Sequence, residues 1–194
     1  MNSKFRVAIF ASGSGSNAEE IANYFQNNPF IKVVLILSNN PHAFVLDRAK
    51  KLNLPSKVFN REEYTSSKVL EWLTEYEVTH VVLAGFLWLV PSAFLKVYPD
   101  KIINIHPALL PKFGGKGMYG MKVHELVRQL NETETGITIH LVNDKFDEGE
   151  ILYQGKCKVL STDTPEQIAQ KVHQLEYAFY PKVIERWILD KNLD

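Results

Sequence analysis

The stretch NIHPALLP, residues 104–111, follows an apolar run and places an amide and an imidazole two residues apart, just before a proline. Alternate side chains of a β-strand project to the same face, so Asn104 and His106 should point together where the strand ends. In open α/β sheets, ligands bind beyond the carboxyl ends of parallel strands. The stretch therefore predicts a polar site at such an edge, provided that its neighbours are parallel strands.

Apolar runs of strand length precede and include this stretch, and helical patterns separate them. The runs lack polar alternation, which indicates a parallel sheet buried under helices on both faces. Strands are expected at residues 5–11, 31–37, 57–59, 80–86 and 101–105. Asn17 is expected to cap the first helix, and residues 43–52 to form the second. Asn60 and Glu63 have the spacing of a capping box for a third helix through residue 73, and Pro91 opens a short one.

The pattern changes after residue 130, where apolar and polar residues begin to alternate. Residues 135–142 and 151–159, on either side of a turn at 143–149, are typical of an antiparallel strand pair. A long helix is expected at about residues 166–189. The sequence therefore predicts an α/β fold. It is one doubly wound domain of residues 1–194, with a mostly parallel sheet and an antiparallel C-terminal strand pair.

The composition is ordinary for a globular protein and restricts the possible partners. Lys and Arg number 22, as do Asp and Glu, and 45% of the residues are hydrophobic. A zero net charge argues against a nucleic-acid or membrane-surface binder, which would carry a basic excess. The single cysteine, Cys157, suits a reducing compartment, and no apolar run reaches the roughly 20 residues of a membrane span. We expect a cytoplasmic protein with no nucleic-acid and no membrane partner.

The turn SGSGSN, residues 12–17, follows the first predicted strand. Its glycines expose backbone N–H groups at the N-terminus of a helix, which together form a site for an anion. The spacing matches neither the dinucleotide-binding nor the triphosphate-binding glycine motif, so a small phosphate monoester fits better. A flexible turn that only caps a helix is the simpler alternative; we favour phosphate binding.

Two further polar stretches have both a structural and a functional interpretation. Asn104 and His106 are, in the simpler view, an amide and a satisfied histidine beside a turn. The loop that follows, residues 107–120, holds two prolines and four glycines, and loops of this length are often functional. In HLVNDKFDEGEIL, residues 140–152, a carboxylate facing His106 would favour its charged form for acid–base catalysis. A solvated acidic turn remains the default for Asp144, Glu148 and Glu150, and no spacing supports a metal site.

Taken in order, SGSGSN, VVLAGF at 81–86, NIHPALLP and HLVNDKFDEGEIL resemble the phosphoribosylglycinamide formyltransferases over nearly the whole chain. The Asn-x-His-Pro-x-Leu-Leu-Pro run with a downstream Asp-x-Gly is similar to enzymes that use 10-formyltetrahydrofolate. SGSGSN points to the branch that acts on glycinamide ribonucleotide. The resemblance implies a Rossmann-like formyltransferase of de novo purine biosynthesis. It would transfer the formyl group of 10-formyltetrahydrofolate, as co-substrate and without a metal, to the amine of 5-phosphoribosylglycinamide.

The resemblance also implies partners and leaves alternatives. The partners would be small-molecule substrates, and the chain a monomer or homodimer. A 10-formyltetrahydrofolate hydrolase, in which water replaces the amine, is the first alternative. A non-catalytic nucleotide-binding module that uses only SGSGSN is the second, and it predicts no role for Asn104 or His106.

The resemblance further implies roles for individual residues. The catalytic group would be Asn104, His106 and Asp147. The phosphate and the glycinamide end would contact Gly13, Ser14, Gly15, Ser16, Asn17 and Glu176, and the folate would contact Arg61, Leu87, Trp88, Leu89, Val90, His140, Val142 and Asp144. Departures from the usual pattern are Trp88 in place of Arg, Glu150 in place of Pro, and GGKGMYG at 114–120. In the implied mechanism, Asn104 and a protonated His106 donate to the oxyanion, while Asp147 raises the pKa of His106.

Overall fold

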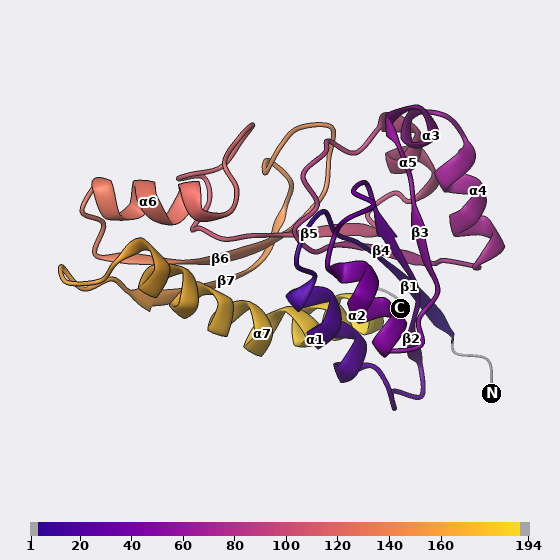
Figure 1. Ribbon diagram of the computed structural model, residues 1–194, viewed down its shortest axis with the longest axis horizontal. Coiled ribbons are helices and arrows are strands. Elements are labelled where there is room, and N and C mark those ends of the chain that lie inside the picture. The colour runs from indigo at the N-terminus through magenta and orange to yellow at the C-terminus, as the bar shows by residue number, and fades with distance from the viewer. Residues whose placement is uncertain (1–3, 191–194) are drawn as a thin grey trace.

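A computed structural model describes residues 4–190, in which a seven-stranded sheet forms the centre of the molecule (Figure 1). The strand order is β3–β2–β1–β4–β5–β6–β7. The strands are β1 (Phe5–Phe10), β2 (Ile31–Ser38), β3 (Ser56–Val58), β4 (His80–Leu83), β5 (Ile102–His106), β6 (Glu134–Leu141) and β7 (Ile151–Lys158). The first five pair in parallel, and β6 and β7 are antiparallel. The predicted fold class is confirmed; residues 1–3 and 191–194 of the predicted domain lie outside the described residues.

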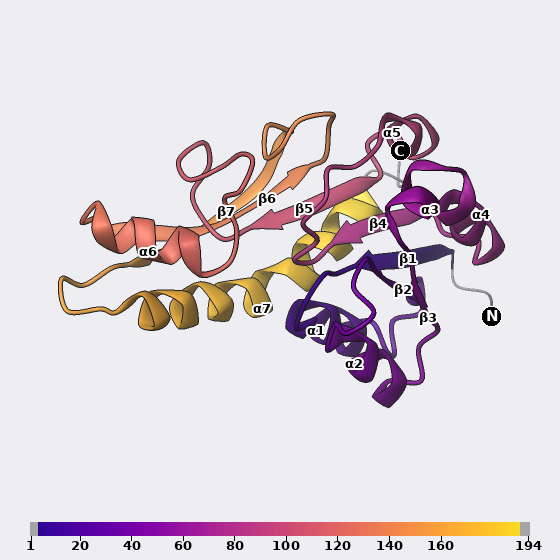
Figure 2. The same cartoon turned by 45° about the horizontal axis from the view of Figure 1, so that its top comes forward.

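Helices cover both faces of the sheet (Figures 1 and 2). One layer contains α1 (Ser16–Tyr24), α2 (Val45–Lys51) and α7 (Pro165–Asp190), and the other contains α3 (Arg61–Thr65), α4 (Lys68–Glu75) and α5 (Ser92–Val97). Successive side chains of β1 point to opposite faces, so Ile9 packs with α1 and α7 while Phe10 packs with α3 and α5. The remaining helix, α6 (Met121–Gln129), packs against α7, where Val127 and Ile168 share a small core.

Several elements differ from their predicted bounds for identifiable reasons. The capping box of Asn60 and Glu63 is present, but the helix it begins is divided into α3 and α4 because the backbone is extended at Ser66. The strand β4 ends at Leu83, two residues before Gly85 takes a positive φ of 73°. The helix α6 was not predicted from the apolar pattern, since few of its residues are buried.

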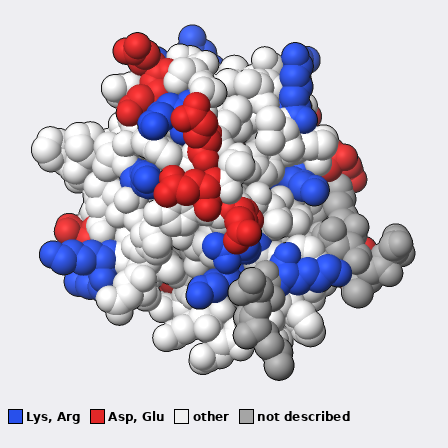
Figure 3. Space-filling model, turned by 90° about the vertical axis from the view of Figure 1, so that its right-hand side faces the viewer, with Lys and Arg blue, Asp and Glu red and all other residues white. Residues whose placement is uncertain are grey.

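The surface carries both signs of charge. On the end of the molecule shown in Figure 3, acidic and basic side chains are interspersed, and apolar and uncharged residues lie between them. Among residues 4–190, no helix is both long and apolar enough to cross a membrane.

Candidate active site

A cavity of about 830 Å³ opens at the carboxyl ends of β1, β4 and β5. Its walls are formed by residues 12–17, 83–90, 104–107, 115–121 and 145–147, together with side chains from α6 and α7. This edge of an open α/β sheet is where ligands bind, and the volume is within the usual range for small-molecule pockets. The three polar stretches of the sequence therefore surround one cavity.

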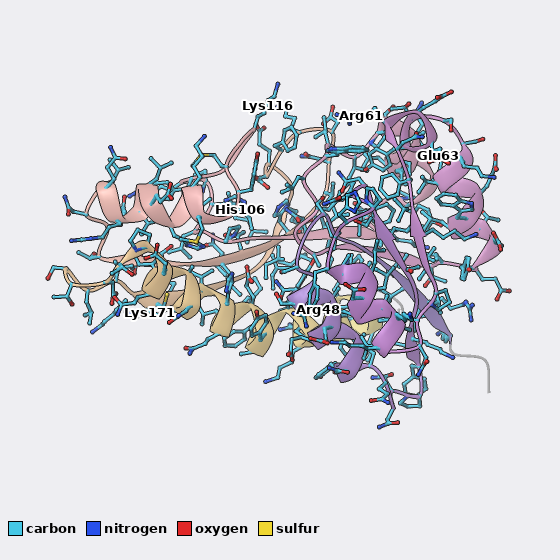
Figure 4. All side chains as sticks on the ribbon, in the orientation of Figure 1. Arg48, Arg61, Glu63, His106, Lys116 and Lys171 are labelled. Atoms are coloured by element: carbon cyan, nitrogen blue, oxygen red, sulfur yellow. The ribbon has the colours of Figure 1, made fainter. Side chains whose placement is uncertain are left out.

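The turn after β1 depends on a glycine at its end. Gly15 has a positive φ of 71°, and a Cβ added there would lie 2.3 Å from the side chain of Val45. With Gly15 as N-cap, α1 begins at Ser16, so its first N–H groups face the cavity edge without intrahelical partners. Arg48 supports the turn by donating from Nε to the Ser14 carbonyl at 2.9 Å, and it also pairs with Glu19 (Figure 4).

The expectation that Asn17 caps α1 is wrong. Because the N-cap is Gly15 and the helix begins two residues earlier than expected, Asn17 lies in its first turn and its side chain is free to reach α7. There its Nδ2 donates to Oε2 of Glu176 at 2.8 Å. Burial raises the pKa of Glu176, although Asn17 partly offsets this effect. Within the described chain, Oδ1 of Asn17 is enclosed and has no hydrogen-bond partner. The turn and α7 thus meet through a buried polar pair that lines the cavity.

The proposed catalytic side chains lie together in the middle of the cavity. The strand β5 includes His106, one residue farther than predicted, and Asn104 lies two residues before it. Nδ1 of His106 is 3.5 Å from Oδ2 of Asp147, and Nδ2 of Asn104 donates to Oδ1 of the same carboxylate at 3.5 Å. Nδ2 of Asn104 also lies 3.2 Å from Nε2 of His140. An amide and an imidazole from β5 therefore converge with a carboxylate from the turn between β6 and β7.

The loop after β5 determines which nitrogen of His106 carries a proton. Nε2 lies 2.7 Å from the carbonyl oxygen of Phe113, which can only accept, so Nε2 is the donor. In the neutral ring, Nδ1 is then the acceptor that faces Asp147. Burial lowers the pKa of His106, and the opposing effects of Asp147 and the Phe113 carbonyl do not fully compensate. The expected direction of the Asp147 contribution agrees with this balance, whereas desolvation acts against the charged ring. The protonated His106 of the implied mechanism stays a prediction.

Asp147 is held in an unusual conformation. Its φ of 58° is uncommon for a residue other than glycine, and such conformations cluster at functional sites. The Gly115 N–H donates to its Oδ2 at 2.9 Å. Two residues on, a Cβ at Gly149 would lie 1.7 Å from the Leu141 carbonyl oxygen, so the Asp-x-Gly spacing reflects a close backbone approach. Burial acts to raise the pKa of Asp147, but the two neighbouring imidazoles and the Gly115 N–H bring it below its ordinary value.

The predicted folate contacts form the other end of the cavity, with one exception. Those that line it are Arg61, Leu87, Trp88, Leu89, Val90, His140 and Val142. The guanidinium of Arg61 stacks 4.2 Å from the ring centroid of Trp88, which packs on Phe59 and Tyr64 (Figure 4). Asp144 is exposed and does not line the cavity, because it lies in the solvent-facing part of the turn before Asp147.

Several lining residues were not predicted individually. They include Phe86, Lys116, Met118, Tyr119, His124, Lys145, Phe146 and His173. The length and glycine content of the loop at 107–120 gave a signal for Lys116, Met118 and Tyr119. No local signal identifies His124, since it lies in the unpredicted helix α6. Among the described residues, no group of three or more His, Cys, Asp or Glu side chains is placed to bind a metal ion.

Comparison with known proteins defines the class of this chain. Residues 5–184 match the formyl transferase family. The chain therefore belongs to the formyl transferase family. This membership confirms the prediction that the protein is a formyltransferase enzyme.

Similar proteins share a more specific name. The chain is 37% identical over 186 residues to phosphoribosylglycinamide formyltransferase, chloroplastic, of Arabidopsis thaliana, covering 92% of this chain and 64% of that protein. It is 35% identical to phosphoribosylglycinamide formyltransferase of Bacillus subtilis over 187 residues, covering 93% of both. The structure of phosphoribosylglycinamide formyltransferase from Anaplasma phagocytophilum superimposes with a TM-score of 0.88 at 33% identity, covering 97% of this chain and 88% of that one.

Proposed function

We propose that the protein transfers the formyl group of 10-formyltetrahydrofolate to the amine of 5-phosphoribosylglycinamide, a step of purine biosynthesis. The observation that carries this proposal is a single cavity that joins an anion-binding turn to an Asn–His–Asp group. The names of the relatives support it over the hydrolase. A hydrolase needs no phosphate site, and a nucleotide-binding module needs no Asn104 or His106. We expect it to act in the cytoplasm, as a monomer or homodimer with small-molecule partners.

The nucleotide would occupy the half of the cavity next to α1. Its phosphate would accept from N–H groups of residues 13–17, where the N-terminus of α1 adds a favourable dipole. Glu176, which Asn17 holds in place, would contact the glycinamide end of the nucleotide. This arrangement directs the free amine toward His106.

The folate would occupy the half lined by residues 87–90. The apolar side chains there suit the pterin, and the Arg61 guanidinium, held against Trp88, suits the carboxylates of the benzoylglutamate. His140 and Val142 would face the formyl-bearing end, beside Asn104.

The chemistry follows from the protonation states of the central group. When the amine attacks the formyl carbon, the C–N bond forms and charge develops on the formyl oxygen. Asn104 would donate to this oxyanion through Nδ2, a contribution on the order of 10²–10³ in rate. His106, neutral before the reaction, would take the proton of the amine at Nδ1. Asp147, at 3.5 Å, would stabilise the imidazolium.

The same proton would complete the transfer. The imidazolium of His106 can donate it to N10 of the folate as the C–N10 bond breaks, which restores the neutral ring. Such a relay is worth about 10²–10⁴ in rate.

The test is a spectrophotometric assay with 10-formyl-folate, with and without 5-phosphoribosylglycinamide. We expect folate product to form only when the nucleotide is present, in equal amount to formylated nucleotide. Product release in water alone would instead identify the hydrolase. Nucleotide binding with no reaction would identify the binding module.

A further inference from the structure

The helix α6 contributes a buried histidine to which the proposed chemistry gives no role. His124 is 2% exposed and lines the cavity. In the part of the chain that the structure describes, its Nδ1 is enclosed and has no hydrogen-bond partner. Buried polar groups are nearly always paired, so a histidine without a protein partner in a cavity wall has its other nitrogen, Nε2, available to a ligand.

Contacts between side chains place His124 near both the nucleotide side of the cavity and the catalytic centre. On the nucleotide side, Asn17 donates to Glu176, and His173 lies one helical turn before Glu176 on α7. The ring centroid of His173 is 6.4 Å from that of His124. On the other side, His124 is within electrostatic range of His106, and Figure 4 shows His106 beside the end of α6. The sequence of groups along the cavity is therefore phosphate turn, Glu176, His124, His106.

The substrate of the proposed function carries its groups in a matching order: phosphate, then, beyond the ribose, the glycinamide N–H, the glycinamide carbonyl and the amine. With its phosphate in the turn and its amine at His106, the glycinamide carbonyl lies next to His124. We propose that His124 donates a hydrogen bond from Nε2 to this carbonyl oxygen and thereby selects nucleotides that carry an amino amide. This assignment rests on the proposed function.

The state of the His124 ring agrees with a donor role. Burial and the neighbouring histidines lower the pKa of His124 to about 4, so the ring is neutral at pH 7 and carries one N–H. If the enclosed Nδ1 carried the proton, it would be a buried donor without an acceptor. Unpaired buried donors are rarer in proteins than unpaired buried acceptors. The proton therefore resides on Nε2, the nitrogen left to face the cavity.

The chemistry of the substrate identifies the acceptor. The attacking amine must keep its lone pair for the formyl carbon, so it is a poor acceptor for Nε2–H. The amide N–H of the glycinamide can donate to the Glu176 carboxylate, which is acceptor-only when ionised. The amide carbonyl is the strong acceptor that remains for Nε2–H. Because the His124 ring is neutral, it can donate to this carbonyl without also attracting the phosphate of the nucleotide.

The experiment compares wild type, His124→Leu and His124→Gln, since glutamine retains an N–H near the position of Nε2. Calorimetric binding is measured for 5-phosphoribosylglycinamide and for its thioamide analogue, in which sulfur, a weak hydrogen-bond acceptor, replaces the carbonyl oxygen while the N–H and the charge are retained. We expect His124→Leu to weaken binding of the substrate roughly tenfold, the worth of one neutral hydrogen bond, and His124→Gln to restore most of it. The folate KM should not change in either variant.

The analogue separates a contact from a structural effect. Wild type should bind the analogue roughly tenfold more weakly than the substrate, whereas His124→Leu should bind both equally. Equal weakening of both ligands in His124→Leu, or unaltered binding of the substrate, overturns the assignment. His42→Leu, at an exposed histidine outside the cavity, is the matched control. If the wild-type protein binds the nucleotide but does not formylate it, the proposed function is refuted. The comparison of binding between the variants still decides the role of His124 in that case. Absence of nucleotide binding refutes both.

Discussion

Replacing Asp147 with asparagine removes a charge from the centre of the cavity while it preserves shape. Asparagine tolerates the left-handed backbone that this position requires, so the turn should keep its conformation. The amide oxygen can still accept from the Gly115 N–H. What is lost is the attraction between a carboxylate and the His106 imidazolium that forms when the amine gives up its proton.

The separation of the two groups sets the size of the effect. Nδ1 of His106 lies 3.5 Å from Oδ2 of Asp147, and both side chains are almost fully buried. At an effective dielectric constant of about 20, unit charges at this distance attract by about 5 kcal/mol. Solvation of the cavity and the residual dipole of the amide reduce this value. We expect kcat to fall about 10²- to 10³-fold, with the KM of both substrates nearly unchanged.

Steady-state kinetics at pH 7 and thermal unfolding test this expectation together. Asp144→Asn is the matched control, because Asp144 belongs to the same turn but is exposed and lies outside the cavity. His106→Ala should cost a similar factor. The double variant should lose much less than the product of the two, because the residues act as a unit. Near-normal turnover in Asp147→Asn, or full additivity in the double variant, would show that the carboxylate serves only the structure of the turn.

Three other changes test different parts of the molecule. Ser16→Asp places a negative charge against the phosphate and should raise the nucleotide KM about 10- to 100-fold with little change in the folate KM. The neutral variant Ser16→Asn should raise the nucleotide KM only slightly, and an equal loss of affinity for both substrates in Ser16→Asp would indicate misfolding. Glu176→Gln should raise the nucleotide KM about tenfold while leaving unfolding unchanged, because Gln can still accept from Asn17; unchanged kinetics would make Glu176 a structural residue. Burial lowers the pKa of His80 to about 4, so the unfolded chain binds a proton there first as pH falls below 6.5. The free energy of unfolding, measured in urea, should therefore fall by about 2 kcal/mol between pH 7 and pH 5 because of this one group, and this fall should be absent in His80→Phe. An equal fall in both proteins would show that another group causes it.

Local rules were sufficient for most of the elements, α6 excepted, and for bringing the polar stretches to one edge of the sheet. Unbroken apolar runs identify β1, β2, β4 and β5 because strands covered on both faces have no solvent side. Parallel strands bring their carboxyl ends to one edge, so the turn after β1 and the end of β5 had to meet. The capping box at Asn60 was readable because its two hydrogen bonds join residues three apart in the sequence.

Features that depend on distant contacts were not readable. Asn17 has the residue type of a cap, but Gly15 takes that position and a carboxylate on α7 engages Asn17 instead. The helix α6 has a narrow apolar stripe that includes a histidine, so no simple pattern predicts it. Its burial depends on α7, which follows more than thirty residues later.

The surroundings of His106 show how long-range structure bears on a chemical role. Sequence reasoning identified the carboxylate and assumed that it would hold the ring charged. The folded chain encloses the ring, and the Phe113 carbonyl fixes the proton on Nε2. A ring that begins neutral, with its free nitrogen toward Asp147, can accept a proton from an attacking amine; a ring that begins charged cannot. Because Phe113 and Gly115 lie in the same loop, that loop sets both the tautomer of the base and the position of its carboxylate. Its unusual GGKGMYG sequence can therefore alter substrate contacts while the two backbone groups that govern the chemistry remain in place.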